Sequence, residues 1–346
     1  MENDLLRVVD VNLNRAREGL RVLEDLARLQ FRDAALAEKA RLERHELKAI
    51  TDRYYHRLLP ARDVSGDFGA AYASNEHDNS RALVTANVRR VQEAARVLEE
   101  TARNLLPEAV EAFKRLRYAA YELEKDFAEK MAAEAKVLRL RSLKLYVIVG
   151  TAHTTSRPVG DVARAAIEGG AGMIQLREKV LAAREFFESA QNLRDLTRSA
   201  GIPLIINDRL DIAAVVGADG VHLGQTDLPV SAARRLLGDE AIVGVSTHSV
   251  DEAVTAERQG ADYIGVGPVF ATPTKPNVQP VGPALLTEVL KAVRVPVVAI
   301  GGITADNVGK ILATGVSTVA VISAVSGAVE VAEAARLLRR LLEGSI

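Results

Sequence analysis

The chain has 346 residues, more than a single ordinary domain holds, so two domains are expected. Its 45 Lys and Arg nearly balance its 46 Asp and Glu, and this balance gives no support for a nucleic-acid or membrane-surface partner. The absence of cysteine excludes disulfides, thiolate metal sites and cysteine nucleophiles.

The beginning of the chain, MENDLLRVVDVN, is charged and lacks the apolar core of a signal peptide. No uninterrupted apolar run approaches the roughly 20 residues that a membrane-spanning helix needs. We therefore expect a soluble, cytoplasmic protein without a membrane partner.

Residues 1 to about 140 have the pattern of helices: they are rich in Arg, Glu, Leu and Ala, with apolar positions recurring at spacings of three and four. A stretch over residues 60–80 is different, because its Gly, Asp and Asn content predicts a loop. We take residues 1–135 as an all-helical domain.

From about residue 143, short β-branched apolar runs alternate with amphipathic helical patterns. Eight such runs begin at Leu145, Met173, Pro203, Gly220, Ile242, Tyr263, Pro296 and Thr318. Alternation of this kind predicts parallel strands, and eight units in about 200 residues predict an α/β fold of the TIM-barrel type, (β/α)8, over residues 143–346. A doubly wound sheet is the alternative, but short strand-to-helix spacings and Gly-rich loops after the last two runs favour the barrel.

The helical domain contains an internal duplication. The segment NLNRAREGLRVLEDLAR from Asn12 recurs as NVRRVQEAARVLEETAR from Asn87, 75 positions later (87 − 12). Its matching polar pairs are Asn12 and Asn87, Arg15 and Arg90, Glu18 and Glu93, and Arg21 and Arg96. On a helical wheel Asn12 and Arg15 fall inside the apolar arc, so both are expected to be buried.

A buried arginine is rare unless it is paired, which leaves two interpretations of the duplication. One is a structural Arg–Glu pair that ties two symmetric helices together. The other is an anion site facing the middle of a helical bundle, to which the loop residues Arg62, Asp63 and Asp67 would add phosphate and Mg²⁺ ligands. The chain has no Walker A motif or other nucleotide-binding fingerprint.

In a barrel of this type the active site lies at the C-terminal ends of the strands. After the second run, Gln175, Arg177 and Lys179 stand at alternate positions, so their side chains share one face. Two cations and an amide suit a diphosphate and the edge of a heterocycle. A salt-bridged strand end is the alternative.

Two carboxylates follow neighbouring runs. The third run ends in Asn207 and Asp208, and Asp227 follows the fourth. Carboxylates on adjacent strand ends suit Mg²⁺, which takes one or two of them together with substrate phosphate and water. For Asp227 the alternative is a helix N-cap.

Polar and small residues also follow the remaining runs. Ser246 and His248 follow the fifth run, although His248 is equally well explained as a hydrogen-bonded histidine without a catalytic role. The later ends supply Thr272, Thr274, Lys275, Gly301, Gly302, Ile322 and Ser323. Hydroxyls, a cation and glycine backbone N–H groups form a phosphate cradle, so the barrel is expected to join a diphosphate donor to a monophosphate acceptor.

The motifs QLREK, NDR, HLGQTD, GVSTHS, GPVFATPTK, AIGGI and VIS, which occur in this order, resemble the thiamine phosphate synthase family. The resemblance implies a pyrimidine diphosphate site at Gln175, Arg177, Lys179, Asn207, Ser246 and Lys275, of which Arg177, Ser246 and Lys275 would be catalytic. It implies Mg²⁺ at Asp208 and Asp227, and a thiazole phosphate site at Thr272, Thr274, Gly302, Ile322 and Ser323. The implied reaction releases pyrophosphate and forms thiamine phosphate.

The segments NLNRAREGLRVLED, RHELK and ARDVSGDFG resemble the all-helical hydroxymethylpyrimidine phosphate kinase domain that is fused to some of these synthases. The resemblance implies a bifunctional enzyme that uses ATP and acts on small pyrimidine and thiazole phosphates, and that could form a homo-oligomer. Its kinase residues would be Asn12, Arg15, Glu18, Arg62, Asp63, Asp67, Asn87, Arg90 and Glu93.

Two other functions are weighed against this one. The duplicated amphipathic helices would also suit a dimerisation or interaction module beside a monofunctional synthase. The barrel could instead be a thiazole tautomerase, but an isomerase needs no diphosphate site, and Gln175, Arg177 and Lys179 argue against it.

Overall fold

The computed structural model describes residues 2–62, 79–272 and 278–344. It divides into two compact units, Met1–Ala135 and Lys136–Ile346, and each unit is described by itself. Among the described residues, no helix is long and apolar enough to cross a membrane.

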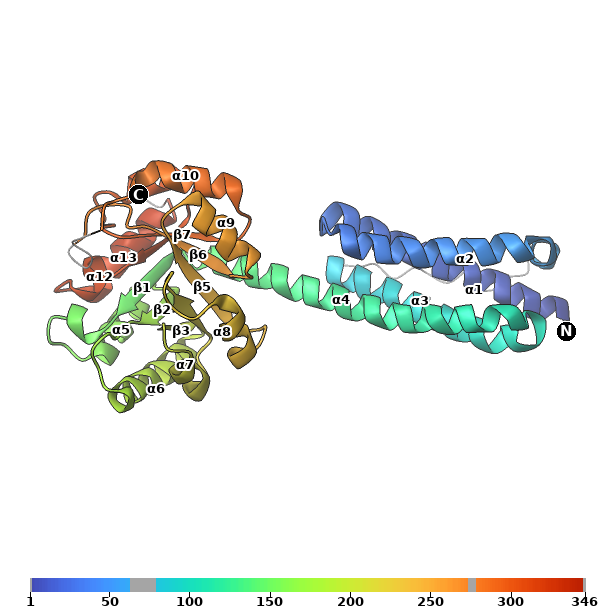
Figure 1. Cartoon of the computed structure of the whole chain (residues 1–346), viewed down its shortest axis with the longest axis horizontal. Coiled ribbons are helices and arrows are strands. Elements are labelled where there is room, and N and C mark those ends of the chain that lie inside the picture. The colour runs from blue at the N-terminus through green and yellow to red at the C-terminus, as the bar shows by residue number, and fades with distance from the viewer. Residues whose placement is uncertain (1, 63–78, 273–277, 345–346) are drawn as a thin grey trace. The chain divides into compact units, whose positions relative to one another are not determined.

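The first unit is built of long helices (Figure 1). These are α1 (Glu2–Asp25), α2 (Ala34–Ala61), α3 (Ser80–Leu105) and α4 (Val110–Ser142), with a π-helical segment at Leu26–Gln30 and a 3-10 turn at Pro107–Ala109. α4 continues into the second unit. Asp33 caps α2 by accepting from the Leu36 N–H at 3.1 Å, and Asn79 caps α3 by accepting from Ala82 at 2.9 Å.

The duplicated segments form α1 and α3, which pack against each other. Their buried apolar residues are equivalent by the repeat: Leu13, Ala16, Leu20 and Leu23 correspond to Val88, Val91, Ala95 and Leu98. Gly19 allows the two helices to approach, because a Cβ atom there would lie 2.9 Å from Cγ2 of Val91 and 3.1 Å from the carbonyl oxygen of Asn87.

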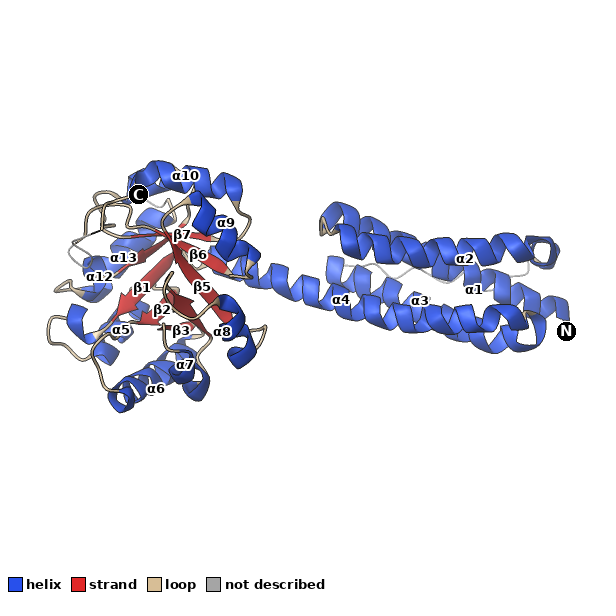
Figure 2. Ribbon diagram, in the orientation of Figure 1, coloured by secondary structure: helices blue, strands red, loops and turns tan. Residues whose placement is uncertain are grey.

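The second unit is a closed barrel of eight parallel strands in sequential order, as the sequence predicts (Figure 2). The strands are β1 (Leu145–Val149), β2 (Met173–Leu176), β3 (Leu204–Asn207), β4 (Gly220–Leu223), β5 (Ile242–Thr247), β6 (Tyr263–Val266), β7 (Val297–Ile300) and β8 (Thr318–Val321). β1 closes the ring by pairing with both β2 and β8. The barrel prediction is confirmed, and the doubly wound alternative is wrong.

Helices surround this ring. They are α5 (Val159–Glu168), α6 (Ala183–Ala200), α7 (Leu210–Val216), α8 (Val230–Leu237), α9 (Val250–Arg258), α10 (Gly282–Ala292), α11 (Val308–Leu312), α12 (Ser323–Ser326) and α13 (Val331–Leu342). Alternation along β1 shows the two faces of the sheet: Leu145 and Val147 belong to the core between strands and helices, whereas Tyr146 belongs to the interior cluster.

The N-terminal end of the barrel is filled by apolar side chains. Leu140 and Leu143 join an interior cluster that includes Met173 and Ile242, the first residues of β2 and β5. Since this end is packed, the space left in the barrel lies toward the C-terminal ends of the strands.

Candidate active site

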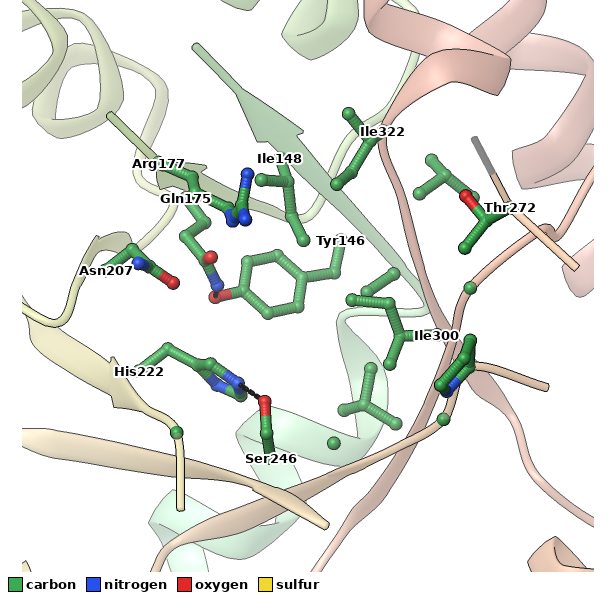
Figure 3. A pocket seen from close by; sticks show the side chains of 18 of the residues that line it. Tyr146, Ile148, Gln175, Arg177, Asn207, His222, Ser246, Thr272, Ile300 and Ile322 are labelled. Atoms are coloured by element: carbon green, nitrogen blue, oxygen red, sulfur yellow. Dashed lines mark hydrogen bonds between the residues drawn. The ribbon is translucent and has the colours of Figure 1, made fainter. Parts of the chain in front are cut away.

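A cavity of about 400 Å³ lies at the C-terminal ends of the barrel strands. Of the residues predicted from the sequence, it is lined by Gln175, Arg177, Lys179, Asn207, Asp208, Asp227, Ser246, Thr272, Gly302, Ile322 and Ser323. Thr274 and Lys275 lie outside the described residues. Figure 3 shows several of these side chains converging from different strands.

Two cations of the cavity, Arg177 and Lys179, follow the end of β2. An Nη1 atom of Arg177 lies 3.3 Å from Nε2 of His153, and burial, followed by the charge of Arg177, lowers the pKa of this histidine. A neutral His153 can accept from the guanidinium and hold it at the edge of the cavity. Lys179 forms an ion pair with Asp208.

Asp208 lies in a strained backbone conformation, with a φ of 60°. Its N–H donates to the carbonyl oxygen of His222 at 2.9 Å, which fixes the carboxylate beside β4. Burial raises the pKa of Asp208; Asp227 also raises it, and Lys179 lowers it. Asp208 and Asp227 therefore influence each other, as two carboxylates at one ligand site would.

Asp227 does not cap a helix, so the N-cap alternative is wrong. Its Oδ2 atom accepts from the Gly224 N–H at 2.7 Å, and α8 begins later, at Val230, with Pro229 in the cap position. The carboxylate thus closes the turn that follows β4 and lines the cavity.

The pair Asp208 and Asp227 provides oxygen ligands of the kind that Mg²⁺ prefers. Within the described residues, no three His, Cys, Asp or Glu side chains gather as a metal cluster. Two carboxylates leave coordination positions for the oxygens of a phosphorylated substrate and for water, which is the usual arrangement for Mg²⁺.

Asn207 carries an unused hydrogen-bond donor. The side chain is 6% exposed and lines the cavity, yet its Nδ2 atom has no hydrogen-bond partner among the described residues. A buried donor without a partner is costly, so this group is suited to a ligand acceptor.

His248 has a structural partner. Its Nδ1 atom lies 3.1 Å from Oε2 of Glu252, and its backbone N–H donates to the same carboxylate at 2.7 Å. This geometry matches the interpretation of a hydrogen-bonded histidine, although the residue also lines the cavity.

Three polar residues in the barrel interior were not predicted from the sequence: Tyr146, His222 and Tyr263. The signal that could have revealed them is a glycine within each of two neighbouring strands. A Cβ atom at Gly244 would lie 2.0 Å from Cζ of Tyr263, and one at Gly265 would lie 3.2 Å from Cε1 of His222.

In the helical unit the predicted burial of Asn12 is confirmed, and its equivalent Asn87 is buried as well. Each asparagine donates from Nδ2 to the carbonyl four residues earlier at 2.8 Å. The repeat therefore preserves a local interaction within each helix.

The expected burial of Arg15 is wrong, because this side chain is exposed. Its equivalent Arg90 is exposed too, as are Glu18 and Glu93. At the helix crossing, Cδ of Arg90 lies 3.8 Å from the place where a Cβ atom of Gly19 would be. A long side chain can cover apolar surface with its stem while its charge stays in water. An anion site at these residues would face solvent rather than the middle of a bundle.

Structural Arg–Glu pairs do occur in the repeat, but at other positions. Glu24 pairs with Arg44 at 2.7 Å, and the equivalent Glu99 pairs with Arg117 at 2.9 Å. Arg62 forms two 2.7 Å hydrogen bonds with the buried carboxylate of Asp10, a residue that the sequence analysis missed. Asp63 and Asp67 lie outside the described residues.

Comparisons with known proteins match the helical unit and the barrel to two different families. A family model described as thiamine monophosphate synthase matches residues 145–325, and the ThiD2 family model matches residues 7–126. Thiamine-phosphate synthase of Thermosynechococcus vestitus is 38% identical, with 98% of this chain and 96% of that protein aligned. The protein of that name from Synechococcus sp. strain CC9311 is 39% identical, with 97% and 96% aligned.

A solved structure gives the same result for the barrel. Thiamine phosphate pyrophosphorylase from Pyrococcus furiosus is similar to 60% of this chain, over 99% of its own length, with 42% sequence identity and a TM-score of 0.55. The curated relatives extend the similarity through the helical unit as well.

Proposed function

The chain belongs to the thiamine-phosphate synthase family, and we propose that its barrel joins hydroxymethylpyrimidine diphosphate to thiazole phosphate while its helical domain makes that diphosphate. In the barrel reaction the bond between the pyrimidine methylene carbon and the diphosphate oxygen breaks, and pyrophosphate leaves. The ring nitrogen of the thiazole then forms a C–N bond to the methylene carbon, giving thiamine phosphate.

The observation that carries the proposal is the meeting of two kinds of polar group in one cavity. Arg177 and Lys179 stand beside the carboxylates Asp208 and Asp227, and the same cavity is lined by Thr272 and by the loops after β7 and β8. Cations and carboxylates suit a diphosphate with a divalent metal, whereas hydroxyl and backbone donors suit a monophosphate.

Asp208 and Asp227 are the residues that would hold Mg²⁺, since their oxygens fit the ion's preferred chemistry. When bound, Mg²⁺ would neutralise negative charge on the diphosphate and so make pyrophosphate a better leaving group.

The chain's own residues would supply the rest of the rate enhancement. Arg177 and Lys179 would stabilise the charge that develops on the departing pyrophosphate, and Asn207 would donate its unused N–H to the pyrimidine diphosphate. Gln175 and Ser246 would hold the pyrimidine ring, and Lys275 would add a further positive charge. With both substrates held in one cavity, the thiazole nitrogen lies close to the methylene carbon, so that the bimolecular step becomes effectively unimolecular.

Thr272, Thr274, Gly302, Ile322 and Ser323 are the proposed thiazole phosphate site. The support for it is that the described members line one cavity together with the proposed diphosphate site. Small residues allow backbone N–H groups to approach a phosphate closely.

For the helical domain we propose phosphorylation of the pyrimidine monophosphate with ATP and Mg²⁺. The ThiD2 match over residues 7–126 supports a kinase over a dimerisation or interaction module. The proposed site residues come from the two copies of the repeat and from the segment after α2. They are Asn12, Arg15, Glu18, Asn87, Arg90, Glu93, Arg62, Asp63 and Asp67. Exposed arginines at equivalent positions of two packed helices would provide anion contacts on one surface.

A coupled assay tests both proposed activities. The full-length protein is given pyrimidine monophosphate, ATP, Mg²⁺ and thiazole phosphate, and we expect thiamine phosphate and pyrophosphate. Supplying the pyrimidine diphosphate directly isolates the barrel reaction. Product from the diphosphate but not from the monophosphate would leave the barrel as a synthase and the helical domain as an interaction module. Isomerisation of the thiazole phosphate without condensation would indicate the tautomerase instead.

A further inference from the structure

A series of hydrogen-bonded polar side chains lines the cavity inside the barrel and ends at Ser246. Gln175 donates from Nε2 to the hydroxyl of Tyr146 at 2.5 Å, and the hydroxyls of Tyr146 and Tyr263 are 3.0 Å apart. Nδ1 of His222 lies 2.9 Å from the Tyr263 hydroxyl, and Nε2 lies 2.8 Å from Oγ of Ser246. We call these five residues the floor network; Figure 3 shows its two ends, from Gln175 to Tyr146 and from His222 to Ser246.

Burial keeps the two tyrosines of the floor network protonated. Tyr146 and Tyr263 are each 1% exposed, and burial raises the pKa of both hydroxyls well above the ordinary value for tyrosine. Each tyrosine therefore contributes one O–H donor and one oxygen acceptor at any pH at which the protein works.

Counting donors gives the network one direction. Because Gln175 donates to Tyr146, the hydrogen of Tyr146 must go to Tyr263, its other neighbour in the floor network. The hydrogen of Tyr263 then goes to Nδ1 of His222. A neutral imidazole that accepts at Nδ1 carries its hydrogen on Nε2, and this atom donates to Ser246.

The opposite direction leaves a buried donor unsatisfied. If Nδ1 of His222 donated to Tyr263, the hydrogen of Tyr263 would go to Tyr146, which already accepts from Gln175. The hydrogen of Tyr146 would then have no acceptor among the described residues, and a buried hydroxyl without an acceptor is costly. An imidazolium at His222 fails in the same way, because its Nδ1 is also a donor.

Once Ser246 accepts from His222, its own hydroxyl hydrogen is available to the cavity. The backbone of Ser246 is held as well, since Gln225 donates to its carbonyl oxygen at 2.6 Å. Among the described residues, the uncharged side chains Tyr146, Ile148 and Ile300 line the same space, whereas the charged Arg177 and Lys179 extend from the end of β2. A neutral aromatic ring therefore fits the floor, and the charged diphosphate fits the end with the cations.

We propose that His222, held in its Nε2–H form by Tyr263, orients Ser246 so that the serine hydroxyl donates to a ring nitrogen of the pyrimidine substrate. This inference rests on the proposed synthase activity. Ser246 would touch the substrate, and His222 and Tyr263 would be positioning residues. A donor oriented before the substrate arrives needs no reorganisation during the reaction, which is why its position affects rate.

A kinetic double-mutant cycle on the full-length protein tests the coupling. Tyr263→Phe removes the donor to Nδ1 while keeping the buried ring, and we expect kcat/KM for the pyrimidine diphosphate to fall about tenfold, the effect of losing one oriented hydrogen bond. In the Ser246→Ala background the same Tyr263→Phe change should have little further effect, about twofold or less. Full tenfold losses in both backgrounds would overturn the proposal.

Tyr146→Phe is the matched control, since it deletes the same atom from an equally buried ring. The hydroxyl of Tyr263 can still donate to His222 in this variant, so the loss should be only about twofold to threefold. Equal losses for Tyr146→Phe and Tyr263→Phe would indicate a general packing defect and would overturn the proposal. Thermal unfolding of each variant, followed by circular dichroism, checks that the proteins compared are folded.

The imidazole ¹⁵N chemical shifts give a readout that does not depend on activity. In protein with ¹⁵N-labelled histidine, the signals of His222 are identified among six histidines by their loss in His222→Asn. We expect the Nε2–H form in the wild type and loss of that preference in Tyr263→Phe. An Nδ1–H form in the wild type would overturn the inference even if the enzyme makes thiamine phosphate. Failure of the wild type to make thiamine phosphate would overturn the proposed function instead.

Discussion

Gly244 on β5 faces the ring of Tyr263 on β6 so closely that a Cβ atom at position 244 would lie 2.0 Å from Cζ and 2.4 Å from the hydroxyl oxygen. The absence of a side chain on one strand is therefore what admits the phenol of its neighbour into the barrel. Because that phenol contacts His222, the glycine also determines where the imidazole stands.

Replacing this glycine should damage both stability and catalysis. Gly244→Ala forces the ring of Tyr263 to move, and overpacking of this kind typically lowers the free energy of unfolding by about 1–3 kcal/mol. Gly160→Ala on α5 is the control, because a Cβ atom there meets nothing within 4 Å. Denaturant unfolding should show a loss only for position 244, together with reduced synthase activity. Equal stability for both variants would show that the barrel absorbs the extra atom.

Removing either proposed metal ligand should nearly abolish thiamine phosphate formation. Asp208→Asn and Asp227→Asn keep the shape of the side chain, and each should reduce kcat/KM about a hundredfold through loss of one preorganised charge contact. Asp211→Asn is the control, since this exposed carboxylate pairs with Arg209 and does not line the cavity. Rates are compared over a range of Mg²⁺ concentrations. Near-normal turnover by the Asp208 and Asp227 variants would show that these carboxylates do not hold the metal.

The Mg²⁺ dependence should vary with pH because burial raises the pKa of Asp208. An ordinary aspartate has a pKa of about 3.9, and a carboxyl with a raised pKa becomes protonated at a higher pH than this. Since only the charged form binds the metal, the half-saturating Mg²⁺ concentration should increase as the pH falls, while the protein is still folded. Titrations with Mg²⁺ at several pH values measure this increase. A half-saturating concentration that stays constant until acid unfolds the protein would argue against the assignment.

The two proposed subsites can be separated by steady-state kinetics. Arg177→Ala should chiefly lower kcat/KM for the pyrimidine diphosphate, and Thr272→Ala should chiefly lower kcat/KM for the thiazole phosphate. Loss of one hydrogen bond to a charged group typically costs about tenfold to a hundredfold. Each substrate is varied while the other is saturating. If each variant shows the same loss of kcat/KM for both substrates, the model of two subsites is wrong.

Arg15 and Arg90 should matter for activity and not for folding, since both are exposed. Arg15→Ala and Arg90→Ala are expected to change the free energy of unfolding by less than about 0.5 kcal/mol while reducing phosphorylation of the pyrimidine monophosphate. Arg21→Ala is the matched control: it is an exposed arginine further along α1, with carboxylate partners of its own. Kinase activity that is unaffected in the Arg15 and Arg90 variants would remove these residues from the proposed site.

The buried members of the repeat should behave in the opposite way. Glu24→Gln removes the charge that pairs with Arg44, and Glu99→Gln does the same for Arg117. Each substitution should lower the free energy of unfolding by about 1–3 kcal/mol, because it weakens a charge-assisted hydrogen bond in a largely buried setting. Similar losses at both sites are expected from the repeat, and thermal melts would measure them.

The sequence by itself determined the barrel fold and the position of the polar residues at the C-terminal ends of its strands. Eight β-branched runs alternating with helical patterns permit few other folds, and side chains at alternate positions of a strand must share a face. Gln175, Arg177 and Lys179 could therefore be assigned to one surface from their spacing alone, and they do line one cavity.

Only the tertiary structure decided which distant residues meet. Tyr146 and Tyr263 are joined because the barrel closes, and no local pattern in either strand specifies that neighbour. The helical wheel likewise placed Arg15 in the apolar arc by angle, but angle does not say where the tip of a long side chain ends. At the α1–α3 crossing the neighbouring helix packs against Gly19, and the charges of Arg15 and Arg90 reach water beside it, because desolvating an arginine costs more than extending its stem along the surface.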